Sequence, residues 1–194
     1  MENIEIQIIK NKNIIYKMSD HPVFSKTVIE MLTVANEFCH FMEKIKNYDK
    51  NDILEYLQKI CPLLYIKGSL LPQIDVNEES IAERYVTEEQ WENIFNDTRK
   101  KLGDDDIYFY INNHYSNEGE PVKASLAENF TDVYQDLRDF VLLYQKNSIE
   151  AKENAVSQCK SLFETHWGYR IINSQKAIHY LLYKDKDDEY DNIL

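Results

Sequence analysis

The residues from Ala155 to Leu182, AVSQCKSLFETHWGYRIINSQKAIHYLL, decide the fold that this sequence predicts. Apolar side chains recur there every three or four positions, which is the spacing of one face of an α-helix. The members of this apolar stripe are Val156, Cys159, Phe163, Ala177 and Leu181. The pattern predicts one long helix late in the chain, which begins at Asn147 with Glu150, runs to about Tyr183 and bends near Gly168.

Two basic side chains, His166 and Arg170, sit at the centre of the stripe, one helical turn apart. An arginine stays charged in a protein, so an arginine on a core-facing stripe must contact a carboxylate or lie in a solvated cleft. The acidic residues that we expect within reach are Glu30 and Glu37 of the first helix and Asp136 of the fourth.

These residues define a candidate polar pocket, for which several interpretations stay open. Its members are Glu30, Glu37, Asp136, His166, Trp167 and Arg170. Arg170 either forms a structural ion pair inside the bundle, lines a pocket that binds an anionic or carboxylate ligand, or faces solvent. Breaking a buried pair would cost about 3–5 kcal/mol, because the partner is left as an uncompensated charge. Trp167 either lines the pocket or packs between helices.

The composition indicates one domain and argues against two classes of partner. A chain of 194 residues can bury a substantial core, and its 4 glycines and 4 prolines are too few for the many turns of a sandwich or barrel. With 34 acidic and 22 basic residues the net charge is −12, which repels nucleic acid and anionic lipid. No stretch approaches the roughly 20 consecutive apolar residues of a membrane span. We expect neither nucleic acid nor a membrane as a partner.

The cysteines and the first residues predict a cytoplasmic location. Cys39, Cys61 and Cys159 are odd in number, widely spaced and set among apolar residues, as reduced buried thiols would be. The opening residues MENIEIQIIKNK lack the basic region of a secretory signal.

Four helical segments are expected before the long helix. The first covers about 24–45 and is apolar around much of its circumference, so we expect it to be central. Over 51–71, Pro62 predicts a kinked pair of short helices. Capping boxes, Thr87 with Gln90 and Ser125 with Glu128, open the third and fourth helices.

The predicted fold class is all-α: an antiparallel, bundle-like single domain of about five principal helices, in which the first and last run past each other in the centre. We expect residues 1–20 to form an amino-terminal arm, in which the weak alternation from Ile4 to Tyr16 allows a short strand. We expect residues 21–183 to form the helical domain. Residues 184–194 are expected to form an acidic flexible tail.

Metal and nucleophile motifs are incomplete. Glu37 and His40 have the Glu-x-x-His spacing of di-iron bundles, but no second such pair is present. An acidic face on the fourth helix could hold Mg²⁺ or Ca²⁺, although such faces are mostly solvated in so negative a protein. Its members are Asp132, Asp136 and Asp139. There is no Gly-x-Ser-x-Gly elbow and no phosphate-binding glycine loop. We expect no metal, no cofactor and no catalytic residue.

Three blocks of sequence resemble an uncharacterised bacterial family, a domain of unknown function in all-helical proteins of about this length. The blocks are VIEMLTVANEFCHF from Val28, CPLLYIKGSLLP from Cys61, and ENFTDVYQDLRDF from Glu128 with FETHWGYRIINSQKAIHYLL downstream. The resemblance spans roughly Phe24 to Leu182. It implies an α-helical fold in a soluble bacterial protein, and it brings no reaction, cofactor or site residue.

Two functions follow as expectations. The first is a non-enzymatic cytoplasmic protein that acts as a protein-interaction or scaffold domain, binding another protein or itself. The alternative is a small-molecule-binding protein or metal-dependent enzyme with a polar interhelical site around Arg170 and His166, because ionisable groups on core-facing positions tend to have perturbed pKa values.

Overall fold

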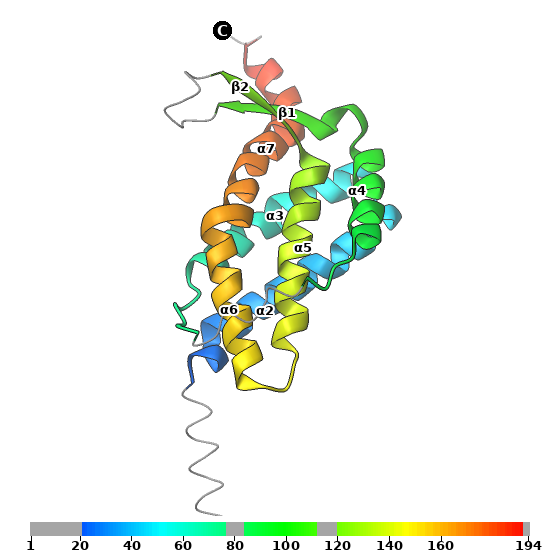
Figure 1. The fold of residues 1–194 in the computed structure, drawn as a ribbon. Helices are drawn as coiled ribbons and strands as arrows, with labels where there is room; N and C mark the ends of the chain where they lie inside the picture. Colours follow the sequence, from blue (N-terminus) through cyan, green and yellow to red (C-terminus); the bar gives the residue numbers. More distant parts are fainter. Residues whose placement is uncertain (1–20, 77–83, 112–119, 192–194) are drawn as a thin grey trace, which may run out of the picture.

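The computed structural model of the chain describes residues 21–76, 84–111 and 120–191. The helices are α2 (Lys26–Glu43), α3 (Lys50–Ser69), α4 (Glu88–Leu102), α5 (Leu126–Tyr144), α6 (Ile149–Leu162) and α7 (Gly168–Asp191). Short 3₁₀ turns lie at Pro22–Phe24, Ile45–Asn47 and Gly103–Asp106, and a π-helical turn, Phe163–Trp167, joins α6 to α7. The strands are β1 (Ile107–Ile111) and β2 (Pro121–Ser125). Since α6 and α7 form one continuous rod (Figure 1), five principal helices result, and the all-α fold class is confirmed with a small strand element added.

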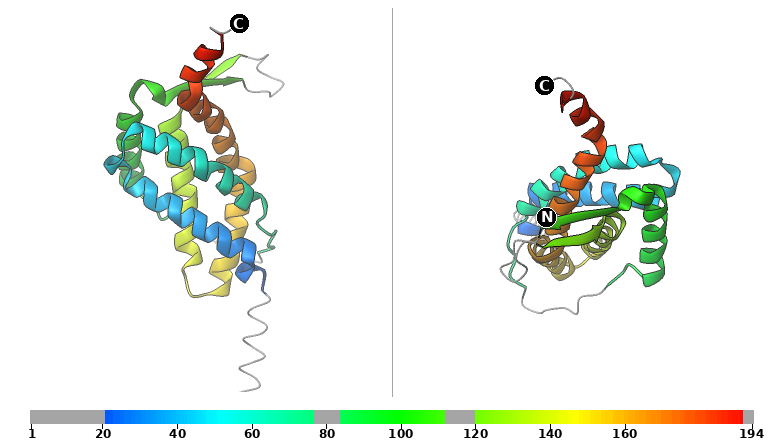
Figure 2. Two further views of the ribbon diagram at one scale, coloured as in Figure 1. Left: turned by 180° about the vertical axis from the view of Figure 1, so that it is seen from behind. Right: turned by 90° about the horizontal axis from the view of Figure 1, so that it is seen from above.

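Helix α5 is the centre of the bundle. It packs against α2, α4, α6 and α7, whereas α2 and α7 each pack chiefly against α3 and α5. The prediction that the first and last helices cross in the centre is therefore wrong. The physical reason is that α5 buries side chains around most of its circumference, including neighbours such as Phe130 with Thr131 and Phe140 with Val141. Figure 2 shows α2 and α3 together on one side of α5.

Helix α3 is continuous through Pro62, so the predicted pair of short helices is wrong. A proline at position 62 deprives the carbonyl of Gln58 of its helical hydrogen bond. The side-chain amide of Gln175, on α7, donates to that carbonyl at 3.3 Å. A group distant in sequence thus replaces the missing backbone donor, and the helix continues to Ser69.

An antiparallel hairpin of β1 and β2 crosses the end of the bundle where α5 begins (Figures 1 and 2), with Phe109 opposite Lys123. No strand is expected in this region from the sequence, because the acids and aromatic residues between Asp104 and Asn113 follow no clear period. The strand expected within Ile4 to Tyr16 lies outside the described residues. The buried carboxylate of Asp106 ties the hairpin to α5, since it accepts hydrogen bonds from the Ser125 hydroxyl and from the Ala127 N–H at 2.7 Å.

The last helix is longer than the sequence predicted. The backbone of α7 is helical to Asp191, whereas the apolar periodicity predicted that the helix ends at about Tyr183. Among the described residues, no helix has both the length and the apolar character needed to span a bilayer.

Candidate functional site

The π-helical turn decides which side chains of the last rod face the core. A π-turn adds one residue to a helical turn, so it shifts the buried stripe by about one position. From the last residue of the turn onwards, the buried side chains are Trp167, Ile171, Ser174 and Ile178. Phe163, Ala177 and Leu181, which the sequence placed on the stripe, are only half-buried. His166 and Arg170 consequently lie beside the buried stripe rather than at its centre, with side chains 33% and 29% exposed.

Glycine at position 168 fits the close backbone approach within this turn. A Cβ at that position would lie 2.4 Å from the carbonyl oxygen of Phe163, which is backbone and cannot give way easily. The local irregularity of the rod near Gly168 is a π-turn that ends at the preceding residue.

Arg170 pairs with Asp132 of α5. The Nη2 and Nε atoms of Arg170 lie 2.7 Å and 2.9 Å from Oδ2 of Asp132. The other carboxylate oxygen of Asp132 accepts a hydrogen bond from Nε1 of Trp91, on α4, at 3.0 Å. Arg170 therefore contacts a carboxylate, as its position required, but the partner is none of the three acids that we expected.

Asp136 and His166 do come together. Nδ1 of His166 lies 2.5 Å from Oδ2 of Asp136, whose side chain is almost fully buried. Nη1 of Arg84, from the segment before α4, lies 3.0 Å from the other oxygen of Asp136. The buried carboxylate thus has a basic partner at each of its oxygens.

Asp139, one turn further along α5, holds the segment that leads into α4. Its Oδ1 accepts hydrogen bonds from the N–H groups of Tyr85 and Val86, at 2.8 Å and 3.0 Å. Its Oδ2 is buried, lies 3.5 Å from Nη1 of Arg84, and has no hydrogen bond within the part of the chain that the structure describes. Burial raises the pKa of the Asp139 carboxyl, and the two N–H groups oppose that rise.

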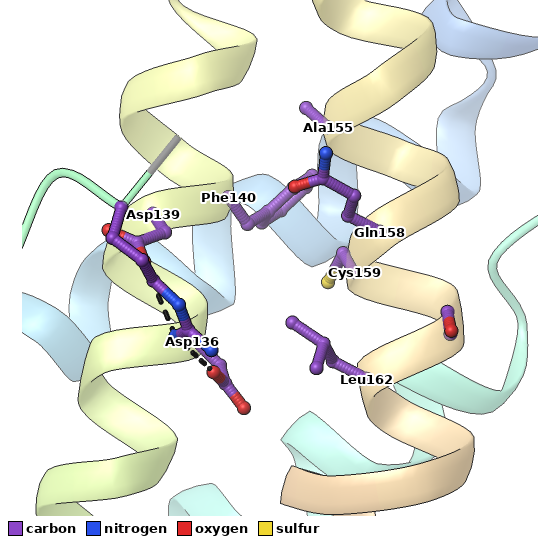
Figure 3. Close-up of a pocket in the computed structure, with 9 residues that line it drawn as sticks. Asp136, Asp139, Phe140, Ala155, Gln158, Cys159 and Leu162 are labelled. Carbon is purple, nitrogen blue, oxygen red and sulfur yellow. Dashed lines mark hydrogen bonds and ion pairs between the residues drawn. The ribbon is translucent and has the colours of Figure 1, made fainter. Parts of the chain in front are cut away.

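A hollow of about 210 Å³ opens beside Asp136 and Asp139. Figure 3 shows the two aspartates on α5 and, across the hollow, Gln158, Cys159 and Leu162 on α6. Arg84 also lines it. The hollow offers carboxylate, guanidinium and amide groups next to apolar walls, which is the chemistry of a site for a small polar molecule.

The other predicted pocket members lie elsewhere. Glu30 pairs with Lys67 at 2.8 Å, and the hydrogen bond from Lys67 lowers the pKa of Glu30. Glu37 is exposed on α2. Trp167 is fully buried, and its Nε1 donates to the Cys159 carbonyl at 3.2 Å, so it packs in the core rather than lining the hollow.

The sequence pattern did not indicate Arg84 or Trp91 as site residues, nor Asp132 and Asp139 as ion-pair partners. The aspartates were noted only as a cation-binding face. In the structure each carboxylate contacts a basic side chain or N–H donors, and the described residues contain no group of three or more His, Cys, Asp or Glu side chains placed to hold a metal.

A second feature is an apolar groove between β1 and α7, which we call the β1–α7 groove. It encloses about 560 Å³ and is lined by residues of both elements. Its exposed large apolar side chains are Ile107, Phe109, Ile172 and Tyr180, and Ile111 continues the row on β1. The alternation in the sequence IYFYI is the signal that could have predicted this strand.

Comparison with known proteins identifies the family but no activity. No curated protein matches the chain. A crystal structure of protein BF1032 from Bacteroides fragilis, a Northeast Structural Genomics Consortium target, is 32% identical with a TM-score of 0.74, and the match covers 83% of this chain and 95% of that chain. A family model described as "Domain of unknown function (DUF5063)" matches residues 22–184. The chain, whose helical fold agrees with that relative, belongs to the DUF5063 family.

Proposed function

We propose that this protein is a non-enzymatic interaction domain that binds a protein segment in the β1–α7 groove. The observation that carries the proposal is the row of exposed apolar side chains along a strand that has one unpaired edge. Within the described residues β1 pairs with β2 alone, so no second strand lies along its other edge. Exposed strand edges bind extended segments by adding a strand, and neighbouring apolar pockets take alternate side chains.

The degree of exposure supports this role. The side chain of Phe109 is 66% exposed and that of Tyr180 is 63% exposed. Single exposed apolar residues are common on proteins, but several that surround one hollow are typical of a docking surface. The partner that fits this chemistry is an extended segment with apolar residues at alternate positions.

The cysteines support a reducing location such as the cytoplasm. Cys39, Cys61 and Cys159 are free and buried, and burial raises the pKa of each thiol. A protein that keeps its thiols unpaired in the core suits a compartment in which disulfides do not form.

The test is peptide selection against the full chain, with binding measured by fluorescence polarisation. Phe109→Glu should weaken the selected peptides by about tenfold or more, which corresponds to about 1.4 kcal/mol. The matched control is Ile66→Glu, because Ile66 is 53% exposed on α3, away from the groove. If the selected peptides bind the Phe109→Glu variant as tightly as they bind wild type, the proposal is refuted.

A second function, small-molecule binding, is supported by the buried Oδ2 of Asp139 beside the hollow of Figure 3. A thermal-shift screen of metals, nucleotides and organic acids tests it, because a ligand that binds the folded state raises apparent stability. A ligand that binds in this hollow should no longer raise the thermal stability of the Arg84→Met variant. If the screen finds no such ligand, this function is not supported.

A further inference from the structure

We infer that the occupant of this surface is a second copy of the chain, and that the protein forms a two-fold dimer whose axis passes beside Phe109. The inference rests on the proposed function, because it names the partner of the same surface. It is carried by the sequence of β1, by the pattern of exposure along the strand, by the apolar area available and by the distribution of charge.

The sequence of β1 is self-complementary. Residues 107–111 read Ile-Tyr-Phe-Tyr-Ile, which is the same in both directions. A two-fold interface sets one surface patch against its own copy. An axis through Phe109 therefore places Phe109 against the partner's Phe109 and Ile107 against the partner's Ile111, so that like side chains meet along the whole strand.

The exposure pattern gives β1 one entirely apolar outer face. Ile107, Phe109 and Ile111 are 38%, 66% and 60% exposed. The two tyrosines between them point to the bundle: the Tyr108 hydroxyl accepts a hydrogen bond from Asn129 of α5 at 2.7 Å, and the Tyr110 ring lies 6.4 Å from that of Tyr169. On β1 this face has no polar side chain, and the charged neighbour that a second copy must accommodate is the exposed Lys123, which lies opposite Phe109 on β2.

The area is sufficient for a specific contact. At roughly 200 Å² for a large side chain, the exposed fractions of the five apolar residues amount to roughly 500 Å² per copy. These residues are Ile107, Phe109, Ile111, Ile172 and Tyr180. Two copies would thus bury about 1,000 Å² from these side chains alone, which reaches the lower limit for a specific interface.

The charge distribution favours this face for self-association. The chain has a net charge of −12, so two copies repel each other over most approaches. The five apolar residues bring no charge themselves, and the charged residues beside them are of both signs: Asp104, Asp105, Lys176 and Lys184 line the groove, and Lys123 lies opposite Phe109 on β2. The remaining repulsion is long-ranged and screened by salt, so the dimer should become tighter as ionic strength rises.

The experiment is analytical ultracentrifugation of the full chain over a range of protein and salt concentrations. Wild type should reach twice the monomer mass of 23.1 kDa, and Phe109→Glu should raise the dimer dissociation constant by at least about 30-fold, as substitution of a central anchor does. Ile66→Glu, the exposed control on α3, should leave it unchanged. Circular dichroism verifies that each variant is folded.

A second measurement tests the axis. Phe109→Cys should give a disulfide-linked dimer on mild oxidation, because the two residues face each other, while Ile66→Cys should not, and the natural cysteines are buried. A wild type that stays monomeric at every concentration, or a dimer that Ile66→Glu dissociates and Phe109→Glu does not, would overturn the inference. If a monomeric chain still binds selected peptides through Phe109, only the self-association fails and the proposed function stands.

Discussion

Replacing Gly68 with alanine tests the packing of α3 against the π-turn. Gly68 is buried near the end of α3, and a Cβ built there would lie 2.3 Å from Cη2 of Trp167 and 2.7 Å from Cδ2 of Phe163. Trp167 is fully buried, and its ring lies 4.9 Å from that of Phe163. The fully buried Trp167 ring cannot move away without displacing the core, so the glycine is a packing requirement.

The magnitude follows from two opposing effects. Alanine in a helix interior is more favourable than glycine by up to about 1 kcal/mol. The new carbon would, however, lie more than about 1 Å inside the optimal contact distance, and such overpacking costs about 1–3 kcal/mol, here at the upper end. We expect Gly68→Ala to lower the free energy of unfolding by about 2 kcal/mol, or to lower Tm by about 4–8 °C.

The assay is urea denaturation followed by far-UV circular dichroism, with the m-value checked against wild type. Ser69→Ala, at the adjacent exposed position, is the control and should change stability by less than about 0.5 kcal/mol. In a protein that already carries Trp167→Phe, Gly68→Ala should lower the free energy of unfolding by less than it does in wild type, because the smaller ring relieves the contact. A Gly68→Ala protein as stable as wild type, or more stable, would refute the reasoning.

Three further predictions concern the ionisable side chains. Asp132→Asn leaves Arg170, which is 29% exposed, without its charge partner and should lower the free energy of unfolding by about 1–3 kcal/mol in urea melts. The double variant Asp132→Asn with Arg170→Met should recover part of this loss. A double variant that recovers none of it would contradict the pairing. Because the folded-state pKa of Asp139 is raised, the folded chain binds that proton more tightly than the unfolded chain, so this group lowers stability as pH rises from the ordinary carboxyl pKa to the raised value. Asp139→Asn should flatten that part of the curve of unfolding free energy against pH, and an unchanged slope would contradict this origin. The buried thiols should react with Ellman's reagent only after urea unfolding, and rapid labelling of native protein would contradict their burial.

The capping signals in the sequence predicted the starts of α4 and α5 correctly, whereas α6 is capped by Ser148 and not by the predicted Asn147. The Thr87–Gln90 capping box is present with both of its hydrogen bonds, and Ser125 caps α5 by accepting from the N–H of Glu128. Such signals act within one helical turn, so they can be identified without knowing the fold. The apolar period of three and four residues is local in the same sense, and it predicted the all-α class.

The candidate site was predictable only in part. The position of Arg170 required a carboxylate, and Asp136 was correctly placed beside His166. Asp132, and not Asp136, pairs with Arg170. The two aspartates are one turn apart on α5, and the periodicity gave no sign of the π-turn that shifts α7 by one residue, so the sequence could not decide between them.

By itself the sequence determined where α4 and α5 begin, that the fold is all-α, and that Arg170 needs an acid. Only the tertiary structure decided that α3 passes through Pro62, because the donor that replaces the lost hydrogen bond is Gln175, distant in the chain. It likewise decided that residues 107–111 form a strand with an exposed apolar face, since a strand needs a partner to pair with. Caps and periodicity depend on residues within a few positions, whereas these outcomes depend on which distant groups the packing brings together.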